Sequence, residues 1–483
     1  MNQILPNKIS SLIRYAVTLI VILGFAGSQS IWATSYTLDE VVLNTEFDPE
    51  PRGEVTLEIS LDPLFQPTLS TLSGTAGVSG SSDGPRQSAL YYNPSGLAID
   101  SDGNLFIADA AQHRIRMLDP EGNVTTIAGF DSGYVDGAGP NARFAFPSAL
   151  VVGSDNNLYV ADRINHVIRK LERPESPGGI WVVTTFAGSG RPGFFDGNGA
   201  VSMFNEPQGL AAGPSGDLYV ADVNNHRIRR ISKRGKVSTY AGSRGGYRNG
   251  VKMEAQFQFP TGLDFDGEGN LYVADSLNRR IRKVTPGTSG VVSTVAGSGE
   301  EGRADGATNL ASFNEPISLV TDGAGHLFVV DRGSSTIRKI TLANSSVNTL
   351  AGTGSNGNTD GPVSAAQLNH PTSIVIGLDG NLAIADGPSH TIRKLIIQNV
   401  SAPTTVTGGE VTAILDISSY GLNTYEEYFV RWIDVSAGRV QQNNLSFFIV
   451  DPPSLIQLEA DAQSPSSAIL NGFVETSGGE TEV

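Results

Sequence analysis

The chain has 483 residues with 33 basic and 49 acidic side chains, a net charge of −16, and no cysteine. The missing thiols exclude disulfides, thiolate catalysis and cysteine-ligated zinc. The acidic balance disfavours a nucleic-acid partner, because a negative surface repels phosphate. Glycine accounts for 56 residues, a turn-rich composition typical of β-structure.

Residues 1–33 have the pattern of a secretory signal peptide. Lys8 and Arg14 precede the apolar run AVTLIVILGFAG (16–27), and the small residue Ala33 stands at the expected cleavage position. The run is shorter than a comfortable bilayer-spanning helix. We therefore expect export, a secreted or periplasmic location and no stable membrane insertion after cleavage. An uncleaved anchor is the alternative.

Residues 34–67 are expected to form an N-terminal β segment. Within them, GEVTLEISLD (53–62) alternates polar and apolar residues, which is typical of a half-buried strand.

One phrase recurs six times between residues 68 and 402, for example YVADVNNHRIRRI (219–231). The copies are marked by aspartates spaced 53 to 60 residues apart, and a sustained period of this size indicates a propeller or a solenoid. Each copy contains short apolar runs separated by Gly, Asn, Asp and Pro turns, without a helical period. Four antiparallel strands in each copy predict a propeller blade.

The fourth strand, which ends in Ala-Gly, follows only five of the six copies. LSGTAG (72–77), before the first copy, carries the missing ending. We therefore predict an all-β fold: a six-bladed β-propeller closed by an N-terminal strand, together with a small C-terminal β module.

An arginine follows each marker aspartate by seven residues. Six copies argue against catalysis, because an enzyme rarely needs six active sites around one core. We predict structural ion pairs that fix the ends of the blades. The pairs are Asp109–Arg116, Asp162–Arg169, Asp222–Arg229, Asp275–Arg282, Asp331–Arg338 and Asp386–Arg393.

A histidine stands three residues before the arginine in four copies, at His113, His166, His226 and His390. Arg279 and Ser335 replace it in the other two. A metal ligand or a general base needs a particular side chain, so a position that accepts His, Arg or Ser indicates a polar loop contact. We predict no catalytic residue, no metal site and no cofactor. DFDGEGN (264–270) resembles a calcium loop but is better explained as an Asx-Gly hairpin turn.

The inter-blade loops, 17 to 19 residues long, differ from copy to copy, and a ligand site is expected where the copies differ. The candidate binding residues lie just before the Asp-Gly of these loops and are Tyr134, Phe194, Phe195, Tyr247, Arg248 and Arg303. Aromatic and arginine side chains favour a recognition patch on the loop face. The alternative is that each ring packs on its own loop.

Residues 403–460 are expected to form a small β-sheet module. GEVTAILDIS (409–418) alternates like the N-terminal segment, and YEEYFVRWIDV (425–435) adds a further strand. The polar tail, residues 461–483, is expected to be disordered.

NPSGLAIDSDGNLFIADAAQHRIRML (93–118) and EPQGLAAGPSGDLYVADVNNHRIRRI (206–231) resemble NHL repeats, whose Asn-His pair is kept here as Asn165-His166 and Asn225-His226. The resemblance implies a six-bladed propeller. The family includes RNA- and protein-binding modules, cell-surface proteins and an amidating lyase with zinc-binding histidines, whose motif is not matched residue by residue here. Fold alone does not fix function. We expect a binding or scaffold module for a protein or a glycan that uses its inter-blade loop face. The alternative is a metal-dependent hydrolase or lyase with a site at the central channel.

Overall fold

The computed structural model describes residues 67–176 and 178–397 with their side chains, and outside this range only the backbone of the strands named below. The chain divides into two compact units, Pro67–Ile397 and a second one made of Met1–Gln66 and Gln398–Val483. Within the described residues, no helix has the length and apolar character that crossing a membrane would require.

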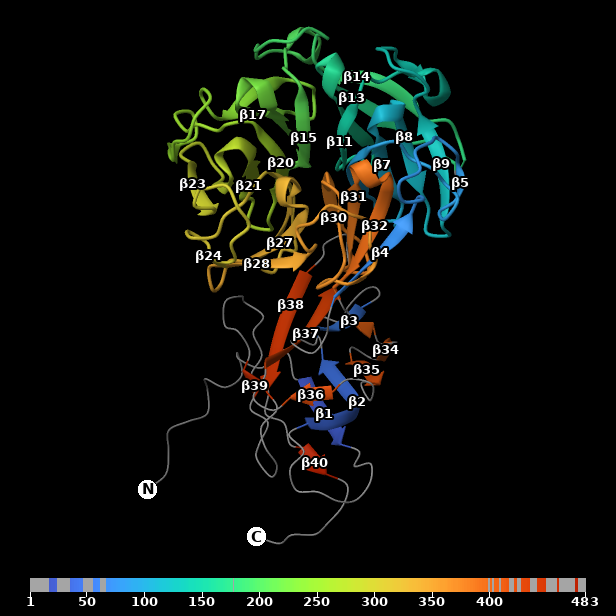
Figure 1. The fold of residues 1–483 in the computed structure, drawn as a ribbon, viewed down its shortest axis with the longest axis vertical. Helices are drawn as coiled ribbons and strands as arrows, with labels where there is room; N and C mark the ends of the chain where they lie inside the picture. Colours follow the sequence, from blue (N-terminus) through green and yellow to red (C-terminus); the bar gives the residue numbers. More distant parts are fainter. Residues whose placement is uncertain are drawn as a thin grey trace. The chain divides into compact units, whose positions relative to one another are not determined.

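The first unit is a six-bladed β-propeller, with its blades arranged around a central axis (Figure 1). Every blade is an antiparallel sheet whose strands follow one another outward from that axis. The innermost strands are β6 (Pro94–Ile99), β11 (Pro147–Val152), β15 (Pro207–Ala212), β20 (Pro260–Phe265), β25 (Pro316–Thr321) and β30 (Ser373–Ile376). The second strands are β7 (Leu105–Asp109), β12 (Leu158–Asp162), β16 (Leu218–Asp222), β21 (Leu271–Asp275), β26 (His326–Asp331) and β31 (Leu382–Asp386).

The outer half of each blade is built from a third and a fourth strand. The third strands are β8 (Arg114–Leu118), β13 (Val167–Glu172), β17 (Arg227–Ile231), β22 (Arg280–Val284), β27 (Thr336–Thr341) and β32 (Thr391–Ile396). The fourth strands are β9 (Asn123–Ala128), β14 (Val182–Ala187), β18 (Val237–Ala241), β23 (Val291–Ala296), β28 (Ser346–Ala351) and β4 (Thr68–Ser73). Short 3-10 turns link the strands: η1 (Ala110–Gln112), η2 (Gly139–Asn141), η3 (Arg163–Asn165), η4 (Gly199–Val201), η5 (Val223–Asn225), η6 (Ser276–Asn278), η7 (Arg332–Ser334) and η8 (Gly387–Ser389).

The predicted closure of the ring is confirmed. β4 pairs antiparallel with β32, with Thr68 opposite Ile396 and Leu69 opposite Leu395, so that the first strand of the propeller completes its last blade. In Figure 1 the blue β4 lies beside the orange β32. Closure in this way covers the sheet edge that blade six would otherwise expose.

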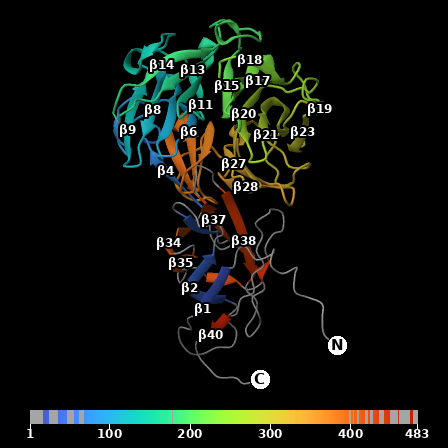
Figure 2. The same cartoon turned by 180° about the vertical axis from the view of Figure 1, so that it is seen from behind.

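The inter-blade loops add a fifth, two-residue strand that the sequence did not predict. Each lies in the loop before its blade and pairs with the fourth strand of that blade, as Figure 2 shows for β19 at the rim. These strands are β5 (Gly84–Pro85), β10 (Gly137–Ala138), β19 (Gly250–Val251), β24 (Gly306–Ala307) and β29 (Gly361–Pro362). In blade three an isolated bridge between Gly197 and Val237 takes this place. The long loops are therefore anchored to the sheets.

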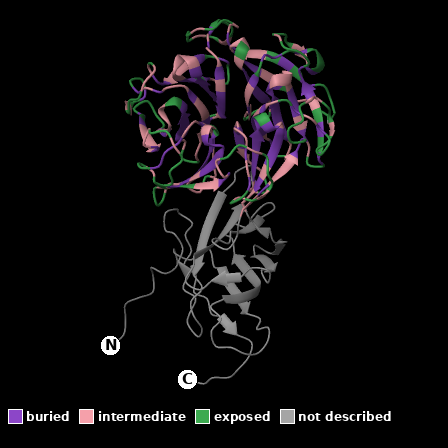
Figure 3. Cartoon of the chain, in the orientation of Figure 1, coloured by how far each residue is buried: buried purple, intermediate pink, exposed green. Residues whose placement is uncertain are grey.

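The hydrophobic core is a series of apolar layers between neighbouring blades. One layer joins Phe106 and Ile115 of blade one to Val160 of blade two, and another joins Ile107 of blade one to Ile392 of blade six. Figure 3 shows buried residues along the strands and exposed ones in the loops. Because each layer is formed by side chains of two adjacent blades, the blades stabilise one another around the closed ring.

The second unit is also built from strands, and it pairs segments from the two ends of the chain. β2 (Ser35–Glu46) pairs with β35 (Glu410–Asp416), and β3 (Val55–Ser60) pairs with β37 (Glu427–Asp434), which pairs with β38 (Gln441–Phe448). Its other strands are β1 (Val17–Leu23), β33 (Val400–Ser401), β34 (Thr404–Thr407), β36 (Gly421–Asn423), β39 (Leu458–Glu459) and β40 (Val474–Thr476). Apart from β1 and β40, the predicted signal peptide (1–33) and tail (461–483) lie outside the described residues.

Candidate functional site

Each blade contains one fully buried arginine that joins its strands to the preceding loop. In blade two, Arg169 donates from Nη1 to Asp162 Oδ2 at 2.8 Å and to the carbonyl oxygen of Arg143 at 2.9 Å. Its Nη2 donates to the carbonyl oxygen of Val135 at 2.8 Å and to Asp136 Oδ1 at 2.5 Å. The side chains of Arg169 and Asp162 are both 0% exposed. A desolvated ion pair of this kind depends on such complete hydrogen bonding.

The arrangement recurs around the ring with small variations. The distances from arginine Nη1 to the paired aspartate are 3.1 Å for Arg116–Asp109, 2.7 Å for Arg229–Asp222, 2.6 Å for Arg282–Asp275, 3.7 Å for Arg338–Asp331 and 3.2 Å for Arg393–Asp386. In blade five, Ser334 Oγ donates to Asp331 at 2.6 Å, and there the arginine lies farther away.

Each arginine has a second side-chain partner that the sequence-based prediction did not include. It is the aspartate of the Asp-Gly in the preceding loop, at Asp83, Asp136, Asp196, Asp305 and Asp360, with Asn249 in blade four. Each stands 33 residues before its arginine, although the repeat itself varies in length. That constant offset is the signal that could have revealed the contact.

The loop aspartate also binds the fourth strand. Asp136 accepts the backbone N–H of Thr185 in β14 at 3.0 Å. In the closing blade, Thr71 of β4 donates its N–H to Asp360 at 2.9 Å, so the N-terminal strand makes the same contact. In all six blades the pairing between the third and fourth strands shifts register at the arginine. A bulge of this kind redirects the side chain toward its partners.

Burial raises the pKa of all six paired aspartates. Burial raises the pKa of Asp109, Asp162 and Asp386 to about 6, while the arginine and amide hydrogen bonds act in the opposite direction. In four blades the buried arginine Nε has no hydrogen-bond partner among the described residues, at Arg229, Arg282, Arg338 and Arg393. The Nη atoms of each arginine are nevertheless bonded, so the network ties the loop rigidly to the sheet.

The histidine position links neighbouring blades. Nδ1 of His166 accepts the backbone N–H of Glu206 in the next blade at 3.1 Å, and Nδ1 of His226 accepts that of Phe259 at 3.3 Å. Both histidines have φ of 56°, a left-handed conformation. An accepting Nδ1 must be unprotonated, and burial lowers the pKa of both rings. The position thus makes a polar contact between blades.

Three of the candidate binding residues occupy equivalent places on successive blades. The rings of Tyr134, Phe194 and Tyr247 each lie against the buried arginine of their blade, at 5.3 Å from Arg169, 4.7 Å from Arg229 and 4.9 Å from Arg282. The rings of Phe194 and Tyr247 also lie at 4.2 Å from Arg227 and 4.0 Å from Arg280. Each ring is 45% exposed. The packing alternative and the recognition alternative are therefore compatible, because a ring can rest on arginine and keep its other side open.

These rings lie along the outer part of the blades. The hydroxyls of Tyr134 and Tyr247 contact Thr185 Oγ1 and Thr294 Oγ1 of the fourth strands at 3.1 and 3.0 Å. Within the described residues no ring contact joins the rings to one another.

The remaining candidates differ in their surroundings. Phe195 is 52% exposed beside Phe194. Arg248 forms an exposed ion pair with Glu254 at 3.1 Å. Arg303 donates to the carbonyl oxygen of Thr353 at 2.5 Å. Arg248 and Arg303 thus lie near the rings in sequence, but each already binds its own part of the surface.

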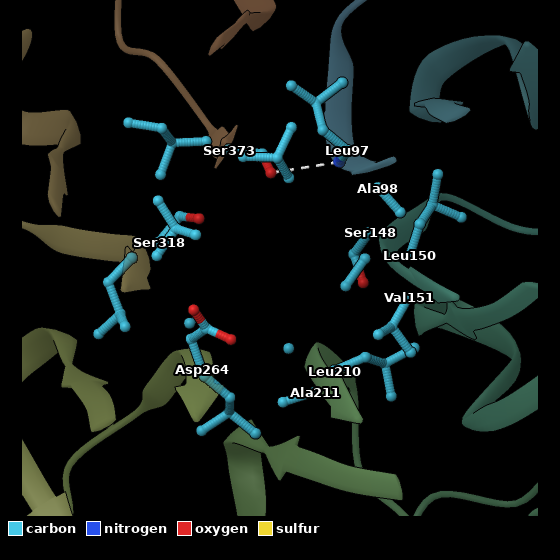
Figure 4. Close-up of a pocket in the computed structure, with 18 of the residues that line it drawn as sticks. Leu97, Ala98, Ser148, Leu150, Val151, Leu210, Ala211, Asp264, Ser318 and Ser373 are labelled. Atoms are coloured by element: carbon cyan, nitrogen blue, oxygen red, sulfur yellow. Dashed lines mark hydrogen bonds between the residues drawn. The ribbon is translucent and has the colours of Figure 1, made fainter. Parts of the chain in front are cut away.

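A central cavity of about 320 Å³ lies between the six innermost strands. Figure 4 shows its apolar wall, with Ser148, Ser318 and Ser373 around it and the carboxylate of Asp264 directed inward. Burial raises the pKa of Asp264 to about 6. In residues 67–176 and 178–397, no group of three or more His, Asp or Glu side chains could hold a metal ion.

Comparison with known proteins assigns the repeats. The NHL repeat family model matches residues 91–117 and 204–231, within blades one and three. The chain carries an NHL-repeat β-propeller. The chain is 28% identical over 343 residues to NHL repeat-containing protein 2 of Bos taurus, covering 63% of this chain and 46% of that protein.

Two further comparisons extend this result. The chain is 30% identical over 288 residues to the Arabidopsis thaliana protein SUPPRESSOR OF QUENCHING 1, chloroplastic, covering 56% of this chain and 27% of that protein. The chain thus spans less than half the length of these curated relatives. A solved protein of unknown function from Bacteroides thetaiotaomicron matches the fold with a TM-score of 0.56 at 18% identity, covering 79% of this chain and 90% of that one. An NHL propeller is in general a binding or scaffold module.

Proposed function

We propose that this NHL propeller is an extracytoplasmic binding module that engages a protein or a glycan through its inter-blade loops, without a cofactor. The observation that carries the proposal is the set of half-exposed rings on three successive blades, Tyr134, Phe194 and Tyr247, each resting on arginine. The location is proposed from the signal-peptide pattern of residues 1–33.

The contacts of the rings support this role. Two of the rings are held by a hydroxyl contact, at Tyr134 and Tyr247, so they lose little side-chain freedom when a partner binds. Aromatic and arginine side chains are enriched at the energetic centres of binding surfaces. Aromatic faces also stack on the apolar faces of sugar rings. The equal spacing of equivalent blades suits an extended partner that contacts all three rings.

The test uses the labelled full chain and the cell-envelope fraction of the source organism. We expect saturable binding that falls at least about tenfold in the triple variant Tyr134→Ala, Phe194→Ala, Tyr247→Ala, because loss of several aromatic anchors removes most of a binding energy. Leu378→Ala is the matched control: this side chain is 61% exposed, in the turn between β30 and β31 at the other end of the strands.

Pretreatment of the envelope distinguishes the two partner classes. Protease would abolish binding to a protein, whereas periodate, which cleaves sugar diols, would abolish binding to a glycan. Binding by the triple variant equal to that of the unmodified chain would contradict the proposal.

A further inference from the structure

The central channel differs from its own six-fold pattern at one position. The fifth residue, counted from the proline at or just before each innermost strand, is aliphatic in five blades, at Ala98, Val151, Ala211, Val320 and Val375, and in blade four it is Asp264. An aspartate among such neighbours is costly unless its charge is used, because burial of an unpaired carboxylate is unfavourable.

A structural role explains only part of this exception. Asp264 Oδ2 accepts the N–H of Thr321 in the next blade at 2.7 Å, and Oδ1 accepts the N–H of Phe265 at 2.9 Å. A neutral group is enough for such a contact, because Ser373 Oγ accepts the N–H of Leu97 at 3.2 Å between blades six and one. The negative charge is therefore not needed for joining the blades.

No positive group in the described part of the chain forms an ion pair with Asp264. The other side chains that line the cavity are uncharged. A carboxylate offers about four acceptor positions, so the two backbone amides and the Thr321 hydroxyl leave room for another donor. The site consequently has one negative charge, further hydrogen-bonding capacity and an apolar surround that includes Leu263 and Val320.

We propose that the central channel binds a small molecule with one protonated primary amine and an aliphatic body, with its ammonium group on Asp264. The aliphatic body packs against Leu210, Leu263 and Val320. A cavity of about 320 Å³ lies within the size range of small-molecule sites. A divalent cation fits less well, because calcium takes six to eight oxygen ligands and Asp264 is the single carboxylate lining this cavity. This site is separate from the loop face and does not depend on it.

The test compares matched probes on the full chain by isothermal titration calorimetry at pH 7.5. The probes are n-butylamine, 1-butanol and butyrate, which share their aliphatic body and differ in charge. We expect n-butylamine to bind at least about tenfold more tightly than 1-butanol, since hydrogen bonds to charged groups contribute more than neutral ones. Butyrate is expected not to bind.

Two variants assign the binding to the channel. Asp264→Asn keeps the shape of the side chain and removes its charge. We expect this variant to bind n-butylamine at least about tenfold more weakly and to bind 1-butanol as the unmodified chain does. Asp102→Asn, which removes a charge whose side chain is 68% exposed, serves as the matched control and is expected to bind as the unmodified chain does.

Equal affinities for the amine and the alcohol, or unchanged amine binding by folded Asp264→Asn, would overturn the proposal. So would the absence of n-butylamine binding up to about 100 mM, far above the affinity expected of a charged small ligand. The comparison of probes on the unmodified chain needs no variant, so the proposal remains testable even where a variant fails to fold.

Discussion

Replacing Arg169 by Met should be one of the most damaging single changes in the propeller. The substitution leaves Asp162 0% exposed without its cationic partner and frees the carbonyl oxygens of Arg143 and Val135. Removal of one member of a buried ion pair costs about 3–5 kcal/mol of unfolding free energy. Asp136→Asn should cost less than about 1 kcal/mol, because Asp136 is 46% exposed and exposed pairs contribute little.

Urea unfolding of the full chain, followed by circular dichroism, provides the measurement. Blade four supports the small cost expected of Asp136→Asn. There Asn249 stands in place of the loop aspartate, and its side-chain oxygen accepts a hydrogen bond from Arg282 at 2.6 Å. The double variant Arg169→Met, Asp162→Asn should recover part of the loss, since it no longer buries an unpaired charge. The reasoning is refuted if the unfolding free energy of Arg169→Met lies within about 1 kcal/mol of that of the unmodified chain. It is also refuted if Asp136→Asn lowers the unfolding free energy as much as Arg169→Met does.

Three further outcomes are expected. Leu69→Ala in the closing strand should cost about 2–5 kcal/mol in urea unfolding, as for a core leucine, and a loss below about 1 kcal/mol would contradict closure. Burial lowers the pKa of His226, so its neutral form favours the folded state, and the contribution of His226 to stability should decline as the pH drops below the ordinary value of 6.5. His226→Asn, compared at pH 7.5 and 5.5, should lessen this decline; an identical pH profile would count against the contact. Gly209→Ala should be strongly destabilising, because its Cβ would collide with the carbonyl oxygen of Thr261, whereas Gly267→Ala, with open space around it, should unfold like the unmodified chain.

Much of the fold follows from spacing alone. The recurrence of aspartates such as Asp162 and Asp222 predicts the number of blades, and the missing fourth strand of the last copy predicts the closing role of β4. Both inferences succeed because a blade is a local unit whose strands follow one another in sequence.

The details that were missed depend on contacts that local patterns do not encode. The edge strand at Gly137–Ala138 is too short to give an alternating pattern. Asp136 looks like an ordinary turn residue until its fixed offset from Arg169 is noticed. Asp264 stands beside a turn that Asp266 closes by accepting the N–H of Asn270 at 2.8 Å, so from sequence the two aspartates seem to serve one hairpin.

The exposure of the three aromatic candidates is a further property that the sequence alone does not determine. Sequence places Tyr134, Phe194 and Tyr247 at equivalent loop positions, but whether a ring lies on its neighbours or faces solvent depends on side-chain packing. The structure gives each ring an arginine beneath it and leaves it 45% exposed, an arrangement that neither alternative described alone.

The pairing of β2 with β35 and of β3 with β37 has a consequence for biogenesis. Strands made at the start of translation find their partners only after the whole of Pro67–Ile397 has been synthesised. A nascent chain therefore carries unmatched strand edges for most of its production, a state prone to aggregation. Early docking of β4 is impossible for the same reason, since β32 emerges last among the propeller strands.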